Sequence, residues 1–202
     1  DGGVADWDGH EDGIIAIGGG GAMDGAKAIG MTVNSGVPLL DFEYRKPPPN
    51  IDETVPFPPF ITIPTTAGTG AETEGGAMIT DTLSRTKLCV AHRGMRPAQA
   101  ILDPELTLGL PPHLTAWTGV DALTHAIEAY LVPSFHPLCD GAALEALAMI
   151  YKWLPIAYED PKNLSARGAM LVGSCIAGVA FNKGLGLTHA ISHMVGAEFD
   201  TQ

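Results

Sequence analysis

Hydrophobic positions in the first half of the chain form short runs that predict buried strands and one helix. The run Gly13–Ile17 is apolar without alternation, which is typical of a strand buried on both faces. Phe60–Pro64 predicts a second buried strand, and Thr86–Ala91 and Gln99–Leu102 are weaker strand candidates. The first strand, a glycine-rich turn and a helix over Ala22–Met31 would form half of a βαβ crossover. This half is therefore predicted to be α/β.

The pattern changes near Asp103 and Pro104, where strand-like runs give way to helical periodicity. Apolar residues then recur at three- and four-residue spacing in four stretches: Val120–Leu131, Cys139–Leu154, Leu164–Phe181 and Leu187–Gly196. Asn163 is the expected N-cap of the third stretch. We expect residues 1–104 to form an incomplete Rossmann-like α/β domain with a parallel sheet. Residues 105–202 are expected to form an incomplete all-helical bundle.

Composition and charge limit the classes of protein to which this chain can belong. The chain has 202 residues, 46% hydrophobic and 17% charged, as in a well-packed soluble protein. Its net charge of −12 argues against a nucleic-acid partner. The longest apolar run, near Ala169–Phe181, falls short of the roughly 20 residues that cross a bilayer, so no membrane span is expected. No disulfide framework, and a reducing cytoplasm, are predicted from three cysteines without paired spacing: Cys89, Cys139 and Cys175.

Two loops have the composition of a nucleotide site. The glycine loop, Gly18–Gly21, lies between a predicted strand and helix, where unpaired N–H groups and the helix dipole favour an anion. It matches neither the G-x-G-x-x-G nor the Walker A pattern, and a plain tight turn is the alternative. The threonine loop, Pro64–Glu72, offers three hydroxyls at the carboxyl end of a strand, the edge at which open α/β sheets bind ligands. A threonine-rich turn that satisfies its own backbone is the alternative here.

Two pairs of residues at i and i+4 are candidates for a metal site. Asp121 and His125 share one face of a predicted helix, and His189 and His193 share one face of another. Carboxylate and imidazole ligands on two helices suit Fe²⁺ or Zn²⁺ and argue against Ca²⁺. The alternative is a helix-stabilising pair and two hydrogen-bonded core histidines. We expect the other histidines at the surface: His10, His92, His113 and His136.

These segments together resemble the iron-activated (group III) alcohol dehydrogenase family. Gly18–Lys27 resembles its Gly-Gly-Gly-Ser-x-x-Asp-x-Ala-Lys loop, and the threonine loop resembles its Pro-Thr-Thr-x-Gly-Thr-Gly-Ser-Glu loop. Asp103–Tyr130 follows the central signature, and Leu187–Asp200 resembles the histidine-rich segment. The resemblance covers nearly the whole chain but only the middle part of a family member. It implies the dehydroquinate synthase-like architecture of that family, without its first βαβ unit and its C-terminal helices.

The resemblance implies a metal held by Asp121, His125 and His189, with a fourth ligand expected at position 203, just after Gln202. With three protein ligands, this chain alone is expected to hold its metal weakly. The implied reaction is reversible hydride transfer between a small or primary alcohol and NAD or NADP, with Fe²⁺, or alternatively Zn²⁺, polarising the substrate oxygen. His193 would lie near the reacting carbon, and it would either relay the proton to solvent or support the site by packing.

Cofactor contacts are also implied by the resemblance. Seven residues would contribute: Gly19, Gly20 and Gly21 at the pyrophosphate, Thr65, Thr66 and Thr69 around the nicotinamide half, and Lys87. Gly21 and Ala71 stand where the family has serines, which removes one hydroxyl from each loop. The choice between NAD and NADP stays open. In the family, the acidic residue that binds the ribose and distinguishes the two nucleotides belongs to the first βαβ unit, which this sequence does not match.

Two other functions stay open at this point. One is a glycerol- or hydroxyacid-type dehydrogenase with Zn²⁺ at the same position, and the other is a catalytically inert chain that binds a nucleotide weakly. A metal-free enzyme similar to maleylacetate reductase is disfavoured, since Asp121 and His125 are both present. The expected partners are a small alcohol or aldehyde and, in the full-length protein, further copies of itself in a dimer or larger oligomer.

Overall fold

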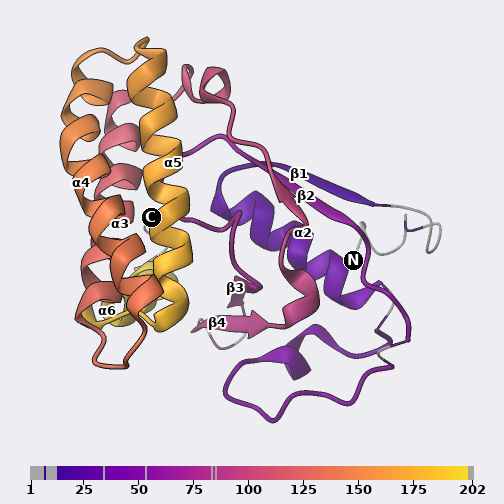
Figure 1. Cartoon of the computed structure of the whole chain (residues 1–202). Coiled ribbons are helices and arrows are strands. Elements are labelled where there is room, and N and C mark those ends of the chain that lie inside the picture. The colour runs from indigo at the N-terminus through magenta and orange to yellow at the C-terminus, as the bar shows by residue number, and fades with distance from the viewer. Residues whose placement is uncertain are drawn as a thin grey trace.

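A half built around a sheet and a helical half lie side by side in this chain (Figure 1). The computed structural model describes Trp7 and residues 13–33, 35–52, 54–82, 84 and 86–199. The strands and one helix come first along the chain, and four long helices follow in the described part. The predicted order, an α/β half and then a helical half, is confirmed.

Three parallel strands form the main sheet, in the order β1 (Ile14–Gly18), β2 (Phe60–Pro64) and β5 (Gln99–Ala100). The register pairs Gly18 with Pro64, so β1 and β2 end at the same level. The N–H of Thr65 then donates to the carbonyl of Gly18 at 2.9 Å. The glycine loop and the threonine loop therefore leave the sheet next to each other, at its carboxyl edge.

Helix α2 (Gly20–Thr32) covers only one face of this sheet. Ala16 of β1 is buried on that face together with Met23 of the helix. Ile15 and Ile17 point the other way and are 65% and 60% exposed. The prediction of a strand buried on both faces is wrong for the described structure, because no described element covers the face of Ile15 and Ile17.

A buried lysine ties α2 to the next strand. The Lys27 ammonium donates to the carbonyl of Gly76 at 2.7 Å and lies 3.7 Å from Asp24 and 3.9 Å from Glu74. The Asp24 carboxylate accepts from the N–H of Met78 at 3.0 Å. These contacts of Lys27 hold parts of the fold together. This agrees with the absence around it of a Walker A pattern, in which a lysine would bind phosphate.

Strands β3 (Gly76–Asp81) and β4 (Thr86–Ala91) form a separate antiparallel pair. The strand over Thr86–Ala91 was predicted, whereas β3 was not, because its Gly-Ala-Met start carries no strand pattern and its pairing with β4 is tertiary. Short 3-10 helices occur at Leu39–Phe42, Arg93–Met95, Pro104–Thr107 and Phe181–Lys183.

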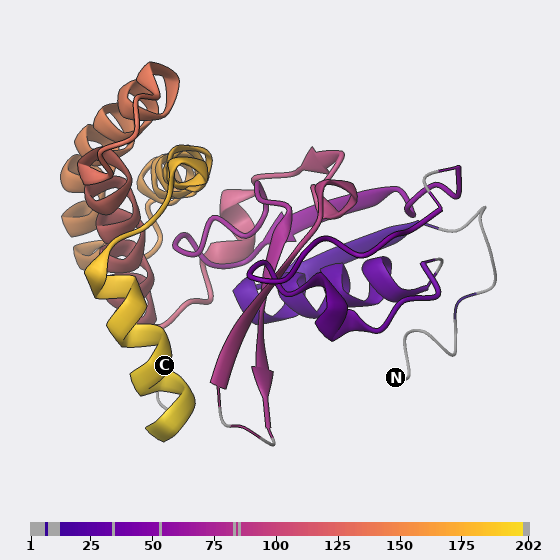
Figure 2. The same cartoon turned by 90° about the horizontal axis from the view of Figure 1, so that it is seen from below.

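The helical half contains α3 (Pro112–Leu131), α4 (Pro137–Glu159), α5 (Leu164–Ala180) and α6 (Leu187–Phe199). The first three pack as a bundle around a core that includes Ile150 and Leu171. Figure 2 shows α6 leaving the bundle and running beside the β3–β4 pair, which it contacts through β4. The side chain of Asn163 accepts from the N–H of Ala166 at 3.0 Å, so the predicted N-cap is confirmed.

Two helix boundaries differ from the prediction for reasons that concern proline. Helix α3 begins at Pro112 rather than Val120, since proline is well suited to the first turn, where its missing N–H costs nothing. Helix α4 continues past Leu154 to Glu159 with Pro155 inside it. Packing of the last turn, which buries Ala157, holds the helix together beyond the proline.

One described segment, Leu164–Lys183, is long and apolar enough to cross a membrane by length and composition alone. The expectation that no apolar stretch reaches that length is therefore wrong. Half of its apolar window is buried inside the protein, where Met170 and Leu171 belong to the bundle core. That environment is typical of the central helix of a globular bundle.

The threonine loop joins the two halves. Ala67 is buried in the core of the helical bundle, although it belongs to a loop of the sheet half. Gly68 lies so close to α3 that an added Cβ would be 2.6 Å from the Cβ of Thr118. The loop is thereby held at the carboxyl edge of the sheet on one side and against the helices on the other.

Candidate functional site

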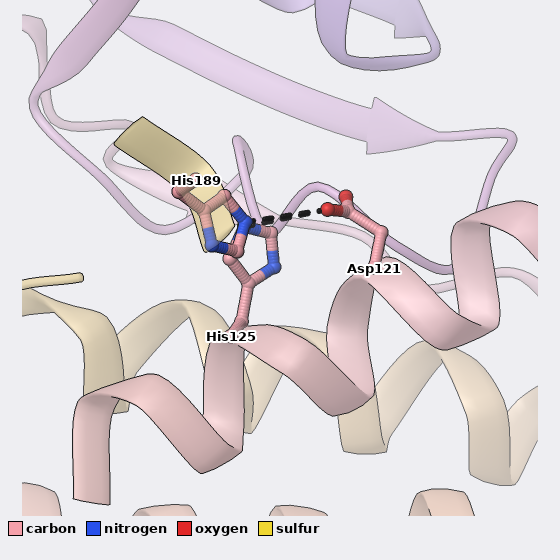
Figure 3. Close-up of side chains that lie close together, drawn as sticks. All are labelled: Asp121, His125 and His189. Atoms are coloured by element: carbon pink, nitrogen blue, oxygen red, sulfur yellow. Dashed lines mark ion pairs between the residues drawn. The ribbon is translucent and has the colours of Figure 1, made fainter. Parts of the chain in front are cut away.

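Three side chains from two helices converge on one point in the helical half (Figure 3). Asp121 and His125 lie one turn apart on α3, and His189 comes from the first turn of α6. The Asp121 Oδ1 atom lies 3.8 Å from His125 Nε2 and 3.4 Å from His189 Nε2. Their ligand atoms all lie within 4.8 Å of one another, so the structure brings together the three residues that the sequence analysis proposed as metal ligands.

Both imidazoles are oriented by a contact at their other nitrogen. His125 Nδ1 lies 3.3 Å from the carbonyl of Gly68, and His189 Nδ1 lies 2.6 Å from Glu128 Oε2. Since a carbonyl and a carboxylate accept hydrogen bonds, each Nδ1 carries the proton and each Nε2 is left with its lone pair. The lone pairs therefore face the carboxylate of Asp121.

This arrangement fits a cation. His189 Nε2 is buried and has no hydrogen-bond partner among the described residues, and a buried acceptor that faces a carboxylate is unfavourable unless a positive charge lies between them. Histidine ligands of metals usually donate their second N–H to a carboxylate or a carbonyl, as His189 and His125 do here. One carboxylate and two imidazoles suit a divalent transition metal or zinc.

The ionisation of the three residues reflects their surroundings. Burial lowers the pKa of His125 to about 4, so this imidazole is neutral at pH 7. Burial would also lower the pKa of His189, but its contacts with Asp121 and Glu128 outweigh that effect and raise it. Burial would raise the pKa of Asp121, and the two imidazoles lower it instead. Since protonation and metal binding use the same lone pair, a cation at this point would compete with a second proton on His189.

The two predicted cofactor loops lie against each other. A Cβ added to Gly19 would lie 3.4 Å from Thr66 Oγ1, and one added to Gly20 would lie 2.7 Å from Thr69 Cγ2. Thr69 Oγ1 accepts from the N–H of Ala71 at 3.4 Å, so this hydroxyl shapes its own loop. Thr66 Oγ1 is buried and has no hydrogen-bond partner in the described part of the chain. One of the three proposed threonines thus has a free hydroxyl at the point where the loops meet.

Lys87 and His193 lie close enough for the charge of the lysine to act on the histidine. Lys87 lies on β4, the strand that α6 contacts. The ring of His193 lies 5.7 Å from that of His189, centroid to centroid. Burial lowers the pKa of His193, and the positive charge of Lys87 lowers it further. His193 therefore lies beside the convergent side chains, and its expected place near the reacting carbon stays a prediction.

The remaining histidines are placed differently from one another. His113 and His136 are exposed, and His136 caps α4 by accepting from the N–H of Cys139 at 3.3 Å. The surface prediction is wrong for His92, which is only partly exposed and packs against Phe57 with ring centroids 4.9 Å apart. His10 lies outside the described residues.

Glu128 was missed by the sequence analysis. It accepts hydrogen bonds from His189 Nδ1, from the N–H of Gly186 at 2.9 Å and from that of Thr188 at 2.6 Å. The signal that could have found it is its spacing, three residues after His125 and seven after Asp121, which places all three on one face of α3.

Comparison with protein families identifies the matched parts of the chain. Residues 3–104 match the model of iron-containing alcohol dehydrogenases, and residues 115–202 match the C-terminal model of the Fe-containing alcohol dehydrogenase family. Both halves of the chain are therefore matched, in the order in which they occur here.

Known proteins give the same result. A probable alcohol dehydrogenase, EutG, of Escherichia coli (strain K12) is 47% identical over 190 residues, which cover 92% of this chain and 46% of that protein. The NAD-dependent methanol dehydrogenase of Bacillus methanolicus is 43% identical, over 95% of this chain and 49% of its own. The chain thus spans about half the length of the curated relatives it matches.

A solved structure supports the fold as well as the sequence match. The crystal structure of sulfoacetaldehyde reductase from Bifidobacterium kashiwanohense in complex with NAD⁺ superposes with a TM-score of 0.83 and 35% identity, over 92% of this chain and 48% of that one. On the strength of both family models and these similarities, the chain belongs to the iron-containing alcohol dehydrogenase family.

Proposed function

We propose that this chain carries the metal-binding and nicotinamide-binding core of an enzyme that interconverts a small alcohol and its aldehyde. The observation that carries the proposal is the convergence of Asp121, His125 and His189 around a buried nitrogen, Nε2 of His189, that has no hydrogen-bond partner among the described residues. One similar protein is named for the oxidation of methanol and another for the reduction of an aldehyde. The shared chemistry is therefore the alcohol–aldehyde pair rather than one substrate.

Asp121, His125 and His189 would hold the metal. A divalent ion bound there would act as a Lewis acid toward the substrate oxygen. The imidazoles would bind through Nε2, since their Nδ1 atoms are engaged by Gly68 and Glu128. Iron is favoured by the family to which the chain belongs, and the same donor set would also accept Zn²⁺.

The glycine and threonine loops would hold NAD or NADP, which supplies the hydride acceptor. Among the described residues, no side chain caps the N-terminus of α2, so its first N–H groups are available to a phosphate. The buried hydroxyl of Thr66 offers a further hydrogen bond beside Gly19. Thr65, Thr69 and Lys87 would complete the contacts, with Lys87 approaching from β4. Of the two nucleotides, NAD is favoured, because one similar protein is named as NAD-dependent and another was solved in complex with NAD⁺.

His193 would exchange the proton of the alcohol with solvent. Its ring lies next to His189 and is partly exposed, so it can reach both the convergent site and water. Burial and Lys87 lower its pKa, which keeps the imidazole neutral and able to accept a proton near pH 7.

The decisive experiment combines metal and nucleotide titrations with an activity assay. Calorimetric titration of the purified chain with Zn²⁺ and Fe²⁺, and with NAD(H) and NADP(H), should show one metal site and one nucleotide site. Asp121→Ala and His189→Ala should abolish metal binding, whereas the control His113→Ala, at an exposed position of α3, should bind as the wild type does.

Three outcomes would correct the proposal. Intact metal binding in Asp121→Ala would show that the ligands lie elsewhere. Nucleotide binding without turnover of short primary alcohols, in the presence of metal, would favour a catalytically inert nucleotide-binding chain. Turnover with Zn²⁺ and none with Fe²⁺ would favour the zinc-dependent glycerol- or hydroxyacid-type alternative.

A further inference from the structure

Glu128 makes three hydrogen bonds, and all of its partners are donors. Its Oε1 accepts from the N–H of Thr188 at 2.6 Å, and its Oε2 accepts from the N–H of Gly186 at 2.9 Å and from His189 Nδ1 at 2.6 Å. A carboxylate that is surrounded by donors on both oxygens is held in its ionised, acceptor-only form. The side chain is only 8% exposed, so these contacts replace nearly all of its hydration.

These contacts fasten the start of α6 to α3. Gly186 and Thr188 flank Leu187, where α6 begins, so Glu128 satisfies N–H groups that the helix itself leaves unpaired. His189 is the buried residue of α6, which otherwise runs outside the three-helix bundle (Figure 2). The approach is close, since a Cβ added to Gly186 would lie 2.9 Å from Glu128 Oε1. Glu128 therefore connects α6 to the helix that bears Asp121 and His125.

The same contact fixes which nitrogen of His189 faces the site. The neutral imidazole of an unrestrained histidine can carry its proton on either nitrogen, and only the form with a bare Nε2 can bind a metal through that atom. Glu128 Oε2 accepts the proton at Nδ1, which leaves the lone pair of Nε2 directed at Asp121 Oδ1, 3.4 Å away.

We propose that Glu128 is the positioning residue of the metal centre, because it anchors α6 and holds His189 in the tautomer and orientation that bind a metal. This inference rests on the proposed function, in which Asp121, His125 and His189 are the ligands. Carboxylates that orient metal-bound histidines raise metal affinity or activity by about 10- to 100-fold in other proteins.

The test uses Glu128→Gln, which keeps the size of the side chain but replaces one acceptor by a donor. Two-bond ¹H–¹⁵N correlation spectra of His189 in the metal-free chain, recorded at increasing pH until the shifts no longer change and the imidazole is neutral, report the tautomer directly. We expect the Nδ1-protonated form in the wild type and a shift toward the Nε2-protonated form in Glu128→Gln. Titration with Zn²⁺ should give an affinity about 10- to 100-fold lower in the variant.

Two further variants keep the outcome interpretable. Glu145→Gln makes the same chemical change at an exposed position of α4 and should leave both readouts unchanged. Gly186→Ala retains Glu128 but displaces its carboxylate, and it should move both readouts in the same direction as Glu128→Gln, even if that variant folds poorly.

The results separate this inference from the proposed function. If the wild type binds no metal, the metal-site proposal fails, while the tautomer of His189 still decides whether Glu128 orients it. An unchanged His189 tautomer in both Glu128→Gln and Gly186→Ala, or an unchanged Zn²⁺ affinity in a wild type that does bind Zn²⁺, would overturn the role of Glu128.

Discussion

Gly70 of the threonine loop lies against Gly178 of α5 so closely that a Cβ added to Gly70 would be 2.7 Å from the Cα of Gly178. The backbone of Gly70 has a φ of +65°, a conformation that residues with a side chain rarely adopt. At this contact two backbones meet with no side chain between them, so the sheet half and the helical half share one interface. The threonine loop can therefore serve both the proposed nucleotide site and the core of the bundle.

We predict that Gly178→Ala destabilises the protein by about 1–3 kcal/mol, because its methyl group would lie 2.5 Å from Thr73 Oγ1 and 2.9 Å from the Cα of Gly70. Urea unfolding measures the loss as a lower midpoint with an unchanged slope. The control is Gly141→Ala in α4, where an added Cβ meets nothing within 4 Å in the described structure. That variant should gain stability by about 0.5–1 kcal/mol from helix propensity. Equal effects of the two substitutions on stability would show that the close contact between Gly70 and Gly178 does not hold the sheet half against the helical half.

The glycine loop gives a second prediction. Gly20→Ala should weaken NAD(H) binding by about tenfold, equivalent to ~1.4 kcal/mol, because the new methyl group would lie 2.7 Å from Thr69 Cγ2 and push the two loops apart. Gly21→Ala places the same methyl group where no described atom lies within 4 Å, and it should leave the free energy of unfolding unchanged or raise it. Calorimetric titration and urea unfolding of both variants check this. An unchanged affinity in Gly20→Ala would indicate that the loops do not form the nucleotide site together.

Much of the fold could be predicted from the sequence where the signal is local. The parallel strands, the helix after the glycine loop and the last two helices follow from apolar runs and periodicity. Strand β3 could not be predicted, because only its pairing with β4 makes Gly76–Asp81 extended. The continuation of α4 through Pro155 likewise depends on packing. The exposure of Ile15 and Ile17 was missed since an apolar run does not say which faces are covered.

The residues of the candidate site could be named from the sequence, but their arrangement in space could not. The i,i+4 spacing placed Asp121 and His125 on one face, but spacing alone does not show that His189 rather than His193 meets them. Only the resemblance to a known family implied that choice. Glu128 was overlooked because a glutamate in a helix is ordinarily a solvated residue, and its partners lie about 60 residues away, as the contact between Glu128 and His189 shows. Contacts of that length come from the tertiary fold alone.

Metal binding should stabilise the protein through the convergent side chains. A ligand that binds only the folded state at about 100 times its dissociation constant adds about 2.7 kcal/mol. We expect Zn²⁺ to raise the melting temperature of the wild type and to leave that of Asp121→Asn unchanged, because this variant loses the one carboxylate among the candidate ligands. Differential scanning calorimetry with and without Zn²⁺ measures both. An equal rise in the two proteins would place the metal elsewhere.

Glu74 should make stability depend on pH. Burial raises its pKa from an ordinary value of 4.5 to about 7, although Lys27 opposes the shift. The folded protein therefore keeps Glu74 protonated at pH values where the unfolded chain ionises it, so the stability it contributes is complete below pH 4.5 and is lost as the pH rises to about 7. The loss is on the order of 1–3 kcal/mol.

Glu74→Gln should flatten the pH dependence between these limits, since the amide does not ionise. Urea unfolding at a series of pH values checks this against Glu145→Gln, which changes an exposed glutamate and should keep the wild-type slope. A slope in Glu74→Gln equal to that of the wild type would assign the pH dependence to another group.

Lys27 should be indispensable for the stability of the sheet half. Its ammonium is buried beside Asp24 and Glu74 and donates to the carbonyl of Gly76, so Lys27→Met leaves the Asp24 carboxylate, and Glu74 at pH values where it is ionised, without their cation. Removal of one partner from a buried ion pair costs about 3–5 kcal/mol, and urea unfolding should show a loss of this size. Lys162→Met, at an exposed lysine, should change stability by less than about 0.5 kcal/mol.

The double variant Lys27→Met/Asp24→Asn should recover part of the loss, because one uncompensated charge is then removed. A double variant no more stable than Lys27→Met alone would show that the lysine acts through its hydrogen bond to β3 rather than through its charge.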